Sequence, residues 1–365
     1  MKRKKQEARL LSRPSRRAAE ETDILVGLDV SKNSTMATGM DWMGNILRQE
    51  KLSSSDNELI QFLGGIQGRK RVVLEACNVW EHIYDAAAST GAVVKMAHPL
   101  KTRIISEATL KTDKVDSEKL AELSRLNAIP EAYAPVNDER ELRHIVRERI
   151  FYARKQKDIM NHTYAVMLQR GIQYEEGILV KRKKREELRS HGIPEVSRGL
   201  DALSHMDEIT KPLDSEIHNA FIKSKEARLL ATIPGVGELT AVTLAAFLCP
   251  VERFQSLEGA VKYCGLCPSV YQSGNVARTG HLVWDCNPLL RWILIEAQWS
   301  TRRYEKKGDV AKVGKRVARR GKPSDGAVAA ARTLLRICVA VLRRGTPYET
   351  HAPLSSSRLD VRNGR

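Results

Sequence analysis

The chain has few aromatic residues, few cysteines and no long apolar run. Phe, Trp and Tyr make up 5% of it, which argues against a surface that recognises nucleic acid mainly by base stacking. Six cysteines in 365 residues are sparse for a disulfide framework, so we expect a reducing cytoplasm. The longest apolar run, near 241–251, is too short to cross a bilayer. The basic N-terminus lacks the apolar segment of a secretory signal, so no membrane partner is expected.

Acidic residues are also scarce relative to basic ones, and the formal net charge is +17. Residues 1–20 carry eight Lys or Arg against two acids, and residues 302–344 carry fourteen against three. These two stretches account for the whole excess, so the positive charge is concentrated in them rather than spread along the chain. Such a concentration of positive charge predicts a polyanionic partner, most often nucleic acid. The candidate contacts in the second stretch are Lys312, Lys315, Arg316, Arg319 and Arg320.

Apolar and β-branched runs predict an α/β domain with a mixed sheet over residues 22–135. Three successive strands are expected, of which the first is 24–30, and further strands are expected at 71–77 and 92–98. Helical patterns follow at about 56–64, 80–89 and 99–127. The resulting order, β-β-β-α-β-α-β-α, is typical of an α/β fold.

The rest of the chain is predicted to be helical. Residues 136–225 have charged helical patterns that indicate long exposed helices, plausibly a coiled coil. The basic run at 181–192 is interpreted as a solvated helix face, although it is compatible with an RNA partner. An all-α domain is expected at 226–350, with disordered tails at 1–21 and 351–365. The turn IPGVG at 233–237 allows either close helix packing or a phosphate contact at a helix N-terminus.

Four carboxylates are the strongest chemical signal. Asp29 and Glu75 each lie near the end of an apolar strand, where an acid is costly unless something pairs with it. Asp113 and Asp116 are three residues apart on a predicted helix, so they share a face. Hard oxygen ligands favour Mg²⁺ or Mn²⁺, and two such ions clamp the oxygens of a reacting phosphodiester. The plainer alternative makes Asp113 a helix cap and Glu75 a surface acid.

Longer motifs carry a family resemblance. GLDVSK, VVLEACNVWEHIYDAAASTGAVVKMAHP and KTDKVDSEKLAEL resemble the RuvC-like, RNase H-fold domain of DEDD-type transposases, in the insertion-sequence family called "IS one-ten". LLATIPGVGELTAVTLAAFL and NPLLRWILIEA resemble that family's C-terminal transposase domain. The resemblance covers about residues 22–350. It implies catalysis and metal binding by Asp29, Glu75, Asp113 and Asp116.

The resemblance also implies a nucleophile in YCGLCPSVYQSGNVARTGH. Ser273, in a Ser-Gly turn, matches the family serine that attacks DNA and forms a covalent phosphoserine link; Ser269 is the second candidate. Arg278 is close enough in sequence to hold a phosphate. Relatives use a structured guide RNA to choose donor and target DNA, and build their sites from different subunits. We therefore expect a bacterial, nucleoid-associated dimer or tetramer that is an RNA-guided transposase.

Two other interpretations remain open. Cys264, Cys267, His281 and Cys286 have a spacing close to that of a zinc finger, although free cysteine is commonly buried. In place of a recombinase, the chain could be a RuvC-like, structure-specific DNA endonuclease that cuts with metal-activated water. A nucleic-acid-binding remnant without chemistry is a third option, against which the intact carboxylate set argues.

Overall fold

The computed structural model describes residues 23–105, 112–175, 177–273 and 276–349 and divides into two compact units. The first unit is Met1–Val136 and the second is Asn137–Arg365. The expected disordered tails lie outside the described residues. Within the described ranges, no helix combines the length and the apolar character needed to cross a membrane.

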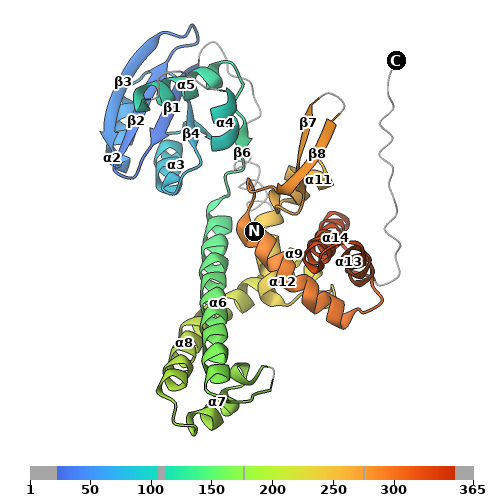
Figure 1. Cartoon of the computed structure of the whole chain (residues 1–365). Coiled ribbons are helices and arrows are strands. Elements are labelled where there is room, and N and C mark those ends of the chain that lie inside the picture. Colours follow the sequence, from blue (N-terminus) through green and yellow to red (C-terminus); the bar gives the residue numbers. More distant parts are fainter. Residues whose placement is uncertain (1–22, 106–111, 176, 274–275, 350–365) are drawn as a thin grey trace, which may run out of the picture. The chain divides into compact units, whose positions relative to one another are not determined.

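The N-terminal unit is built on a six-stranded mixed sheet with the order β3-β2-β1-β4-β5-β6 (Figure 1). Strands β1, β4 and β5 are parallel, and β2, β3 and β6 each run antiparallel to their neighbours. The predicted mixed α/β architecture is confirmed, although the two-residue strand β6 was not anticipated. The strands are β1 (Asp23–Val30), β2 (Ser34–Met40), β3 (Ile46–Ser53), β4 (Arg69–Glu75), β5 (Val93–Ala97) and β6 (Glu131–Ala132).

Helices cover both faces of this sheet. The helices are α2 (Asp56–Gly64), α3 (Trp80–Ser89), α4 (Pro99–Ile105) and α5 (Asp113–Arg125). Apolar side chains of α2 and α3 share one buried cluster with Val26 and Leu74 of the sheet. Leu120 of α5 packs on the other face, against Val73 and Ala97. The sheet is therefore buried between helices, as expected of parallel strands with nearly continuous apolar runs.

A glycine in β1 lets α5 lie directly on the sheet. A Cβ atom at Gly27 would be 2.0 Å from the carbonyl oxygen of Ser117 and 2.6 Å from the amide nitrogen of Ala121. Beside this contact, the hydroxyls of Thr38 and Ser117 are 2.8 Å apart and share a buried hydrogen bond. Because the helix backbone touches the strand here, the position of α5 is tightly fixed.

The second unit begins with two long helices that lie side by side (Figure 1). The elements are α6 (Asn137–Gln169), η1 (Ile178–Val180), α7 (Arg182–Arg189) and α8 (Pro194–Lys223). A Cβ atom at Gly199 of α8 would be 2.3 Å from Oγ1 of Thr163 in α6, so this glycine allows the helices to approach closely. The described part of 138–225 contains no strand, as the sequence predicted.

The remaining elements surround a larger apolar core. They are α9 (Lys225–Leu230), α10 (Glu238–Leu248), η2 (Val251–Arg253), α11 (Leu257–Tyr263), β7 (Pro268–Ser273), β8 (Val276–Leu282), α12 (Pro288–Tyr304), α13 (Asp309–Arg320) and α14 (Pro323–Arg344). Helix α10 is buried from Ala241 to Leu248, packs with α9, α8, α6 and α12, and shares one apolar core with α14. Val146 and Ile150 of α6 belong to the same core, so the long helices are continuous with this part of the unit.

The all-α prediction for residues 226–350 is wrong, because β7 and β8 form an antiparallel hairpin. Val270, Tyr271, Val276 and Thr279 are strand-favouring residues on either side of a Gly-Asn dipeptide, which is a hairpin signal. The expectation overlooked these signals, because the segment was considered only for its Ser-Gly turn.

The glycines of the IPGVG turn have different surroundings. Gly235 has φ +84, and a Cβ there would be 2.5 Å from the amide nitrogen of Thr301. This position therefore serves close packing against α12. Gly237 is the N-cap of α10, and a Cβ there would meet nothing within 4 Å. The packing interpretation holds for Gly235, and the second glycine faces open space.

Candidate active site and nucleic-acid surface

Two of the four predicted carboxylates come together at one edge of the sheet. The parallel register pairs Leu28 of β1 with Leu74 of β4, so the next positions, Asp29 and Glu75, end adjacent strands. Asp29 is two residues beyond Gly27, and Glu75 is two residues beyond Val73. Because side chains alternate between faces, both carboxylates belong to the face that α5 covers. Both side chains are half-buried.

The first turn of α5 lies toward the same edge. At the other end of the helix, Arg125 donates a hydrogen bond to the carbonyl of Trp42, which follows β2. Met40 at the end of β2 pairs with Leu25 near the start of β1, so the C-terminus of α5 lies toward the start of that strand. The N-terminus of α5, with its two aspartates, consequently lies toward the ends of β1 and β4.

The two aspartates of α5 differ in their surroundings. Thr112, rather than Asp113, caps the helix, since its hydroxyl accepts a hydrogen bond from the amide of Val115 at 3.3 Å. Asp113 is exposed, and Asp116 is half-buried with one oxygen 3.7 Å from Nζ of Lys119. Both acids lie in the first helical turn, where negative charge is favourable. The cap interpretation of Asp113 is therefore wrong.

The donor chemistry at this edge fits a hard divalent cation. All four side chains offer carboxylate oxygens, which Mg²⁺ and Mn²⁺ prefer. Across the described ranges, no three His, Cys, Asp or Glu side chains are already arranged around a common point as metal ligands. The four residues therefore match the ions in ligand type, and the strand register brings two of them together.

A thiol that sequence reasoning missed lies next to these carboxylates. Burial raises the pKa of Cys77, and the charges of Asp29 and Glu75 raise it further. The three side chains are therefore near enough to interact electrostatically. The sequence VVLEAC contained this signal, because Cys77 follows Glu75 by only two residues.

The candidate nucleophile lies in the other unit, on the β7–β8 hairpin. Ser273 is the last residue of β7 and is the backbone partner of Val276, and Arg278 is the partner of Tyr271. The side chains of Ser273 and Arg278, and all of residues 274–275, lie outside the described residues. The second candidate, Ser269, donates a hydrogen bond to the carbonyl of His281 at 3.1 Å, which gives it a structural role across the hairpin.

The cysteines with zinc-finger spacing have individual environments. Cys264 is fully buried in the apolar core, and burial raises the pKa of its thiol. Cys286 accepts a hydrogen bond from the guanidinium of Arg291 at 2.9 Å. No metal-binding group of three or more residues includes them in the described chain. Packing and hydrogen bonding account for these two thiols.

The predicted basic contacts form one exposed face of α13. Lys312, Lys315, Arg316, Arg319 and Arg320 are all exposed, while Val310, Ala311 and Gly314 on the opposite face are buried. A Cβ at Gly326 of α14 would be 2.6 Å from the carbonyl oxygen of Gly314, so the two helices touch closely. Within the described ranges, the five basic side chains make no ion pair.

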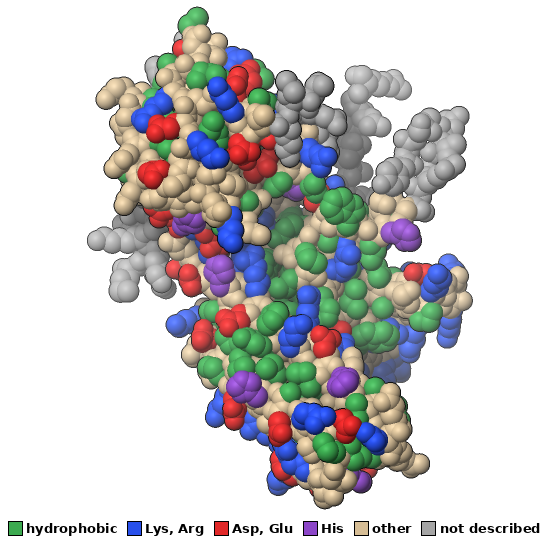
Figure 2. All heavy atoms as spheres, turned by 60° about the vertical axis from the view of Figure 1, so that its left-hand side comes forward, with side chains coloured by type: hydrophobic (Ala, Val, Ile, Leu, Met, Phe, Trp, Pro, Cys, Tyr) green, Lys and Arg blue, Asp and Glu red, His purple; other side chains and the backbone are tan. Residues whose placement is uncertain are grey.

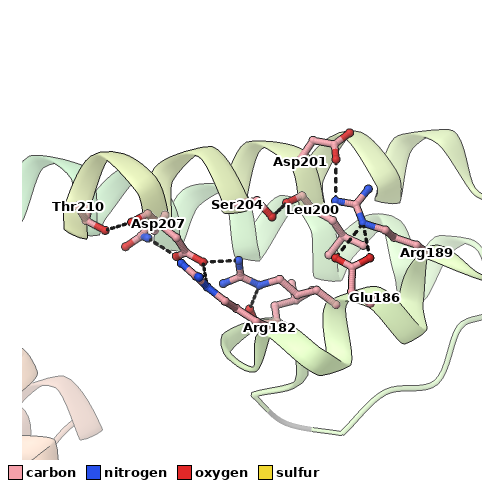
Figure 3. A network of polar contacts seen from close by, with 11 residues as sticks. Arg182, Glu186, Arg189, Leu200, Asp201, Ser204, Asp207 and Thr210 are labelled. Atoms are coloured by element: carbon pink, nitrogen blue, oxygen red, sulfur yellow. Dashed lines mark hydrogen bonds and ion pairs between the residues drawn. The ribbon is translucent and has the colours of Figure 1, made fainter. Parts of the chain in front are cut away.

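The other basic segment, α7, is neutralised by acids. Arg182 and Arg185 both contact Asp207 of α8, with N–O distances of 3.3 and 2.7 Å, and Arg189 contacts Asp201 at 2.7 Å (Figure 3). Figure 2 likewise shows acidic and basic side chains interspersed over the lower part of the molecule. The contrast favours α13 over α7 as a surface for a polyanion.

Comparisons with known proteins match both units of the chain to transposases. Residues 26–170 match a transposase family model of the DEDD IS110 type, and residues 227–311 match the model described as "Transposase IS116/IS110/IS902 family". The fold and the matched regions define a DEDD-type transposase.

Curated relatives agree with this class. The chain is 25% identical to a transposase for insertion sequence element IS1328 from Yersinia enterocolitica, over 68% of this chain and 75% of that protein. It is 22% identical to a transposase for IS1111A from Coxiella burnetii, covering 80% and 81% of the two chains. A pilin gene-inverting protein from Moraxella lacunata is 24% identical, with 89% and 97% covered. The chain belongs to the IS110 family of transposases and is a DNA transposase or recombinase in its enzyme class.

Proposed function

We propose that residues 22–135 form an RNase H-like, RuvC-like catalytic domain in which Asp29, Glu75, Asp113 and Asp116 hold Mg²⁺ or Mn²⁺. The observation that supports this most directly is the β1–β4 register, which places the first two carboxylates at neighbouring strand ends. The N-terminus of α5 then supplies the other two from the same face of the sheet. The half-buried position of Asp29 and Glu75 strengthens their attraction for a cation.

The metal ions would stabilise negative charge on the scissile phosphate and on the leaving oxygen. The carboxylates would hold these ions, and α5 fixes the position of its two aspartates because it rests on Gly27. A divalent ion is favoured here, since four acidic side chains at one edge repel each other without a counter-charge.

The proposed nucleophile is Ser273. Its hydroxyl oxygen attacks the phosphorus of a DNA strand, so that an Oγ–P bond forms while one P–O bond of the strand breaks. The serine proton passes to a base, and the departing oxygen takes up a proton to become a hydroxyl group. A hydroxyl of another strand then attacks the phosphoserine and releases the serine, so strands are exchanged without ATP. Cleavage and rejoining of this kind constitute recombination.

The second unit is proposed to bind nucleic acid and to carry the serine. Residues 136–225 would provide the contact for a dimer or tetramer, and residues 226–350 would form the transposase domain. Its phosphate contacts would be Arg278 and the basic face of α13, defined by Lys312, Lys315, Arg316, Arg319 and Arg320. The partners would be donor DNA, target DNA and a structured guide RNA in a bacterial, nucleoid-associated complex.

The alternative function is a metal-dependent endonuclease that uses activated water. A Ser273→Ala variant separates the two, with Ser269→Ala as the matched control in the same hairpin. On end-labelled DNA that carries the element and its flanks, we expect wild type and Ser269→Ala to form a covalent protein–DNA adduct on denaturing gels. Ser273→Ala should form none and should lose strand transfer. Unchanged cutting by Ser273→Ala, with no adduct in any protein, would support the nuclease instead.

A further inference from the structure

A cavity of about 470 Å³ opens beside the basic face of α13. It lies between the start of α13, the C-terminal half of α14 and the segment that follows α14. Lys312 lines the cavity and also belongs to the basic face. Its volume is within the range of pockets that bind small molecules or parts of larger ligands. A nucleic-acid strand bound along the basic face of α13 would therefore pass the opening of this cavity.

The lining has three chemically distinct parts. Ile337 and Val341 of α14, each 5% exposed, provide an apolar floor, and Tyr348 adds an aromatic ring. Glu305 and Asp309 provide carboxylates, and Glu305 accepts a hydrogen bond from the Tyr348 hydroxyl at 3.2 Å. The rim carries cations, which are Lys307, Lys312 and Arg344.

The segment that carries Tyr348 is held in place. Gly345 ends α14 with φ +67, which turns the chain back toward the core. The amide of Tyr348 then donates a hydrogen bond to the hydroxyl of Thr232 at 2.8 Å. The aromatic ring also packs against the large apolar core. The cavity wall is thus built from anchored groups.

These groups match a nucleobase better than a phosphate. The carboxylates that line the cavity, Glu305 and Asp309, repel phosphate oxygens but accept hydrogen bonds from exocyclic amino groups, as Asp and Glu do with cytosine. The aromatic ring and the apolar floor suit the flat face of a base. The cations at the rim suit the phosphates on either side of it.

We propose that this cavity receives an unstacked base with an exocyclic amino group from a strand whose phosphates lie on the basic face of α13. Adenine, cytosine and guanine meet this requirement, whereas thymine and uracil do not. The inference rests on the proposed nucleic-acid contact of α13 and adds a base-reading element to it. The same base chemistry occurs in DNA and RNA, so the test includes both.

The test is a binding series with the full chain and fluorescent duplexes that contain one unpaired central nucleotide. We expect an unpaired adenine or cytosine to bind roughly tenfold more tightly than an unpaired thymine or an abasic site, because only the first two bring an exocyclic amino group to the carboxylates of the cavity. Tyr348→Ala and Asp309→Asn should each reduce this preference to less than threefold, while Tyr348→Phe should retain it. RNA strands with the same unpaired bases reveal which polymer supplies the base.

The outcomes separate this inference from the proposed function. If fully paired duplex binds with the expected salt dependence but all unpaired bases bind equally, the cavity does not read a base and the α13 contact stands. If Tyr348→Ala and Asp309→Asn keep the full preference, the base is read elsewhere and the inference is overturned. If neither DNA nor RNA binds, the proposed nucleic-acid contact fails together with the inference.

Discussion

Replacing Gly27 with alanine should displace α5 and damage both the stability and the chemistry of the N-terminal unit. The added Cβ would be 2.0 Å from the carbonyl oxygen of Ser117, whereas ordinary contacts begin at 3.4 Å. The strand and helix must therefore separate by about 1.4 Å at this point. Both neighbouring groups are backbone atoms, which no side-chain rotation can move aside.

The expected loss of stability is at the upper end of the range for overpacked cores, about 3 kcal/mol. The aspartates of α5 move with the helix, so strand cleavage should fall by a further factor of about 100 in the remaining folded protein. Hydrogen exchange of β1 and β4 peptides measures the stability, with peptides of α14 as an internal reference.

Gly64→Ala is the matched control in the same unit. Gly64 is the last residue of α2, and a Cβ there would meet nothing within 4 Å. Alanine at this position should leave exchange in β1 unchanged or slow it slightly, because alanine favours the helix. If Gly27→Ala exchanges and cleaves like Gly64→Ala, the close contact between α5 and β1 is not what positions the aspartates.

Three further predictions concern other parts of the chain. Removing three charges from the basic face of α13, with Lys315→Gln, Arg316→Gln and Arg319→Gln, should reduce the slope of log K against log salt for duplex DNA by about 2 to 3; Lys184→Gln, whose lysine pairs with Glu187, should not change it. Asp23→Asn should destabilise the first unit by roughly 3–5 kcal/mol, because it removes the negative charge of a buried ion pair in which Nε of Arg71 lies 2.6 Å from the carboxylate; a loss below about 1 kcal/mol in denaturant titrations would contradict this. Burial and the nearby Glu305 raise the pKa of Tyr348 from 10.0 to about 12, so the folded state holds this proton more tightly. Its contribution to stability should be complete below pH 10 and should decline toward pH 12; thermal melts should show a steeper decline for wild type than for Tyr348→Phe.

Much of the N-terminal sheet could be predicted because its signals are local. The apolar run that contains Leu25, Val26 and Leu28 and the run at Val72–Leu74 are typical of strands buried on both faces. Ser55 precedes α2 as its N-cap, close to the expected start of that helix. Strand β6 could not be found, because two residues carry no periodic pattern.

The carboxylate edge was only partly predictable. The carboxyl ends of parallel strands meet at one edge, so Asp29 and Glu75 could be expected to be neighbours. The place of α5 depends instead on the contact of Gly27 with Ser117, which is a tertiary feature with no local signature. The close packing of α13 on α14 has no local signature either, since it depends on the contact between Gly314 and Gly326.

Calorimetric titration of the full chain with Mn²⁺ tests directly whether the ends of β1 and β4 bind metal. We expect saturable binding by wild type, loss of most of it in Asp29→Asn and in Glu75→Gln, and no change in Asp158→Asn, which removes an exposed acid of α6. Mn²⁺ binding of wild-type strength by an Asp29→Asn/Glu75→Gln double variant would contradict the assignment of the metal centre to the ends of β1 and β4.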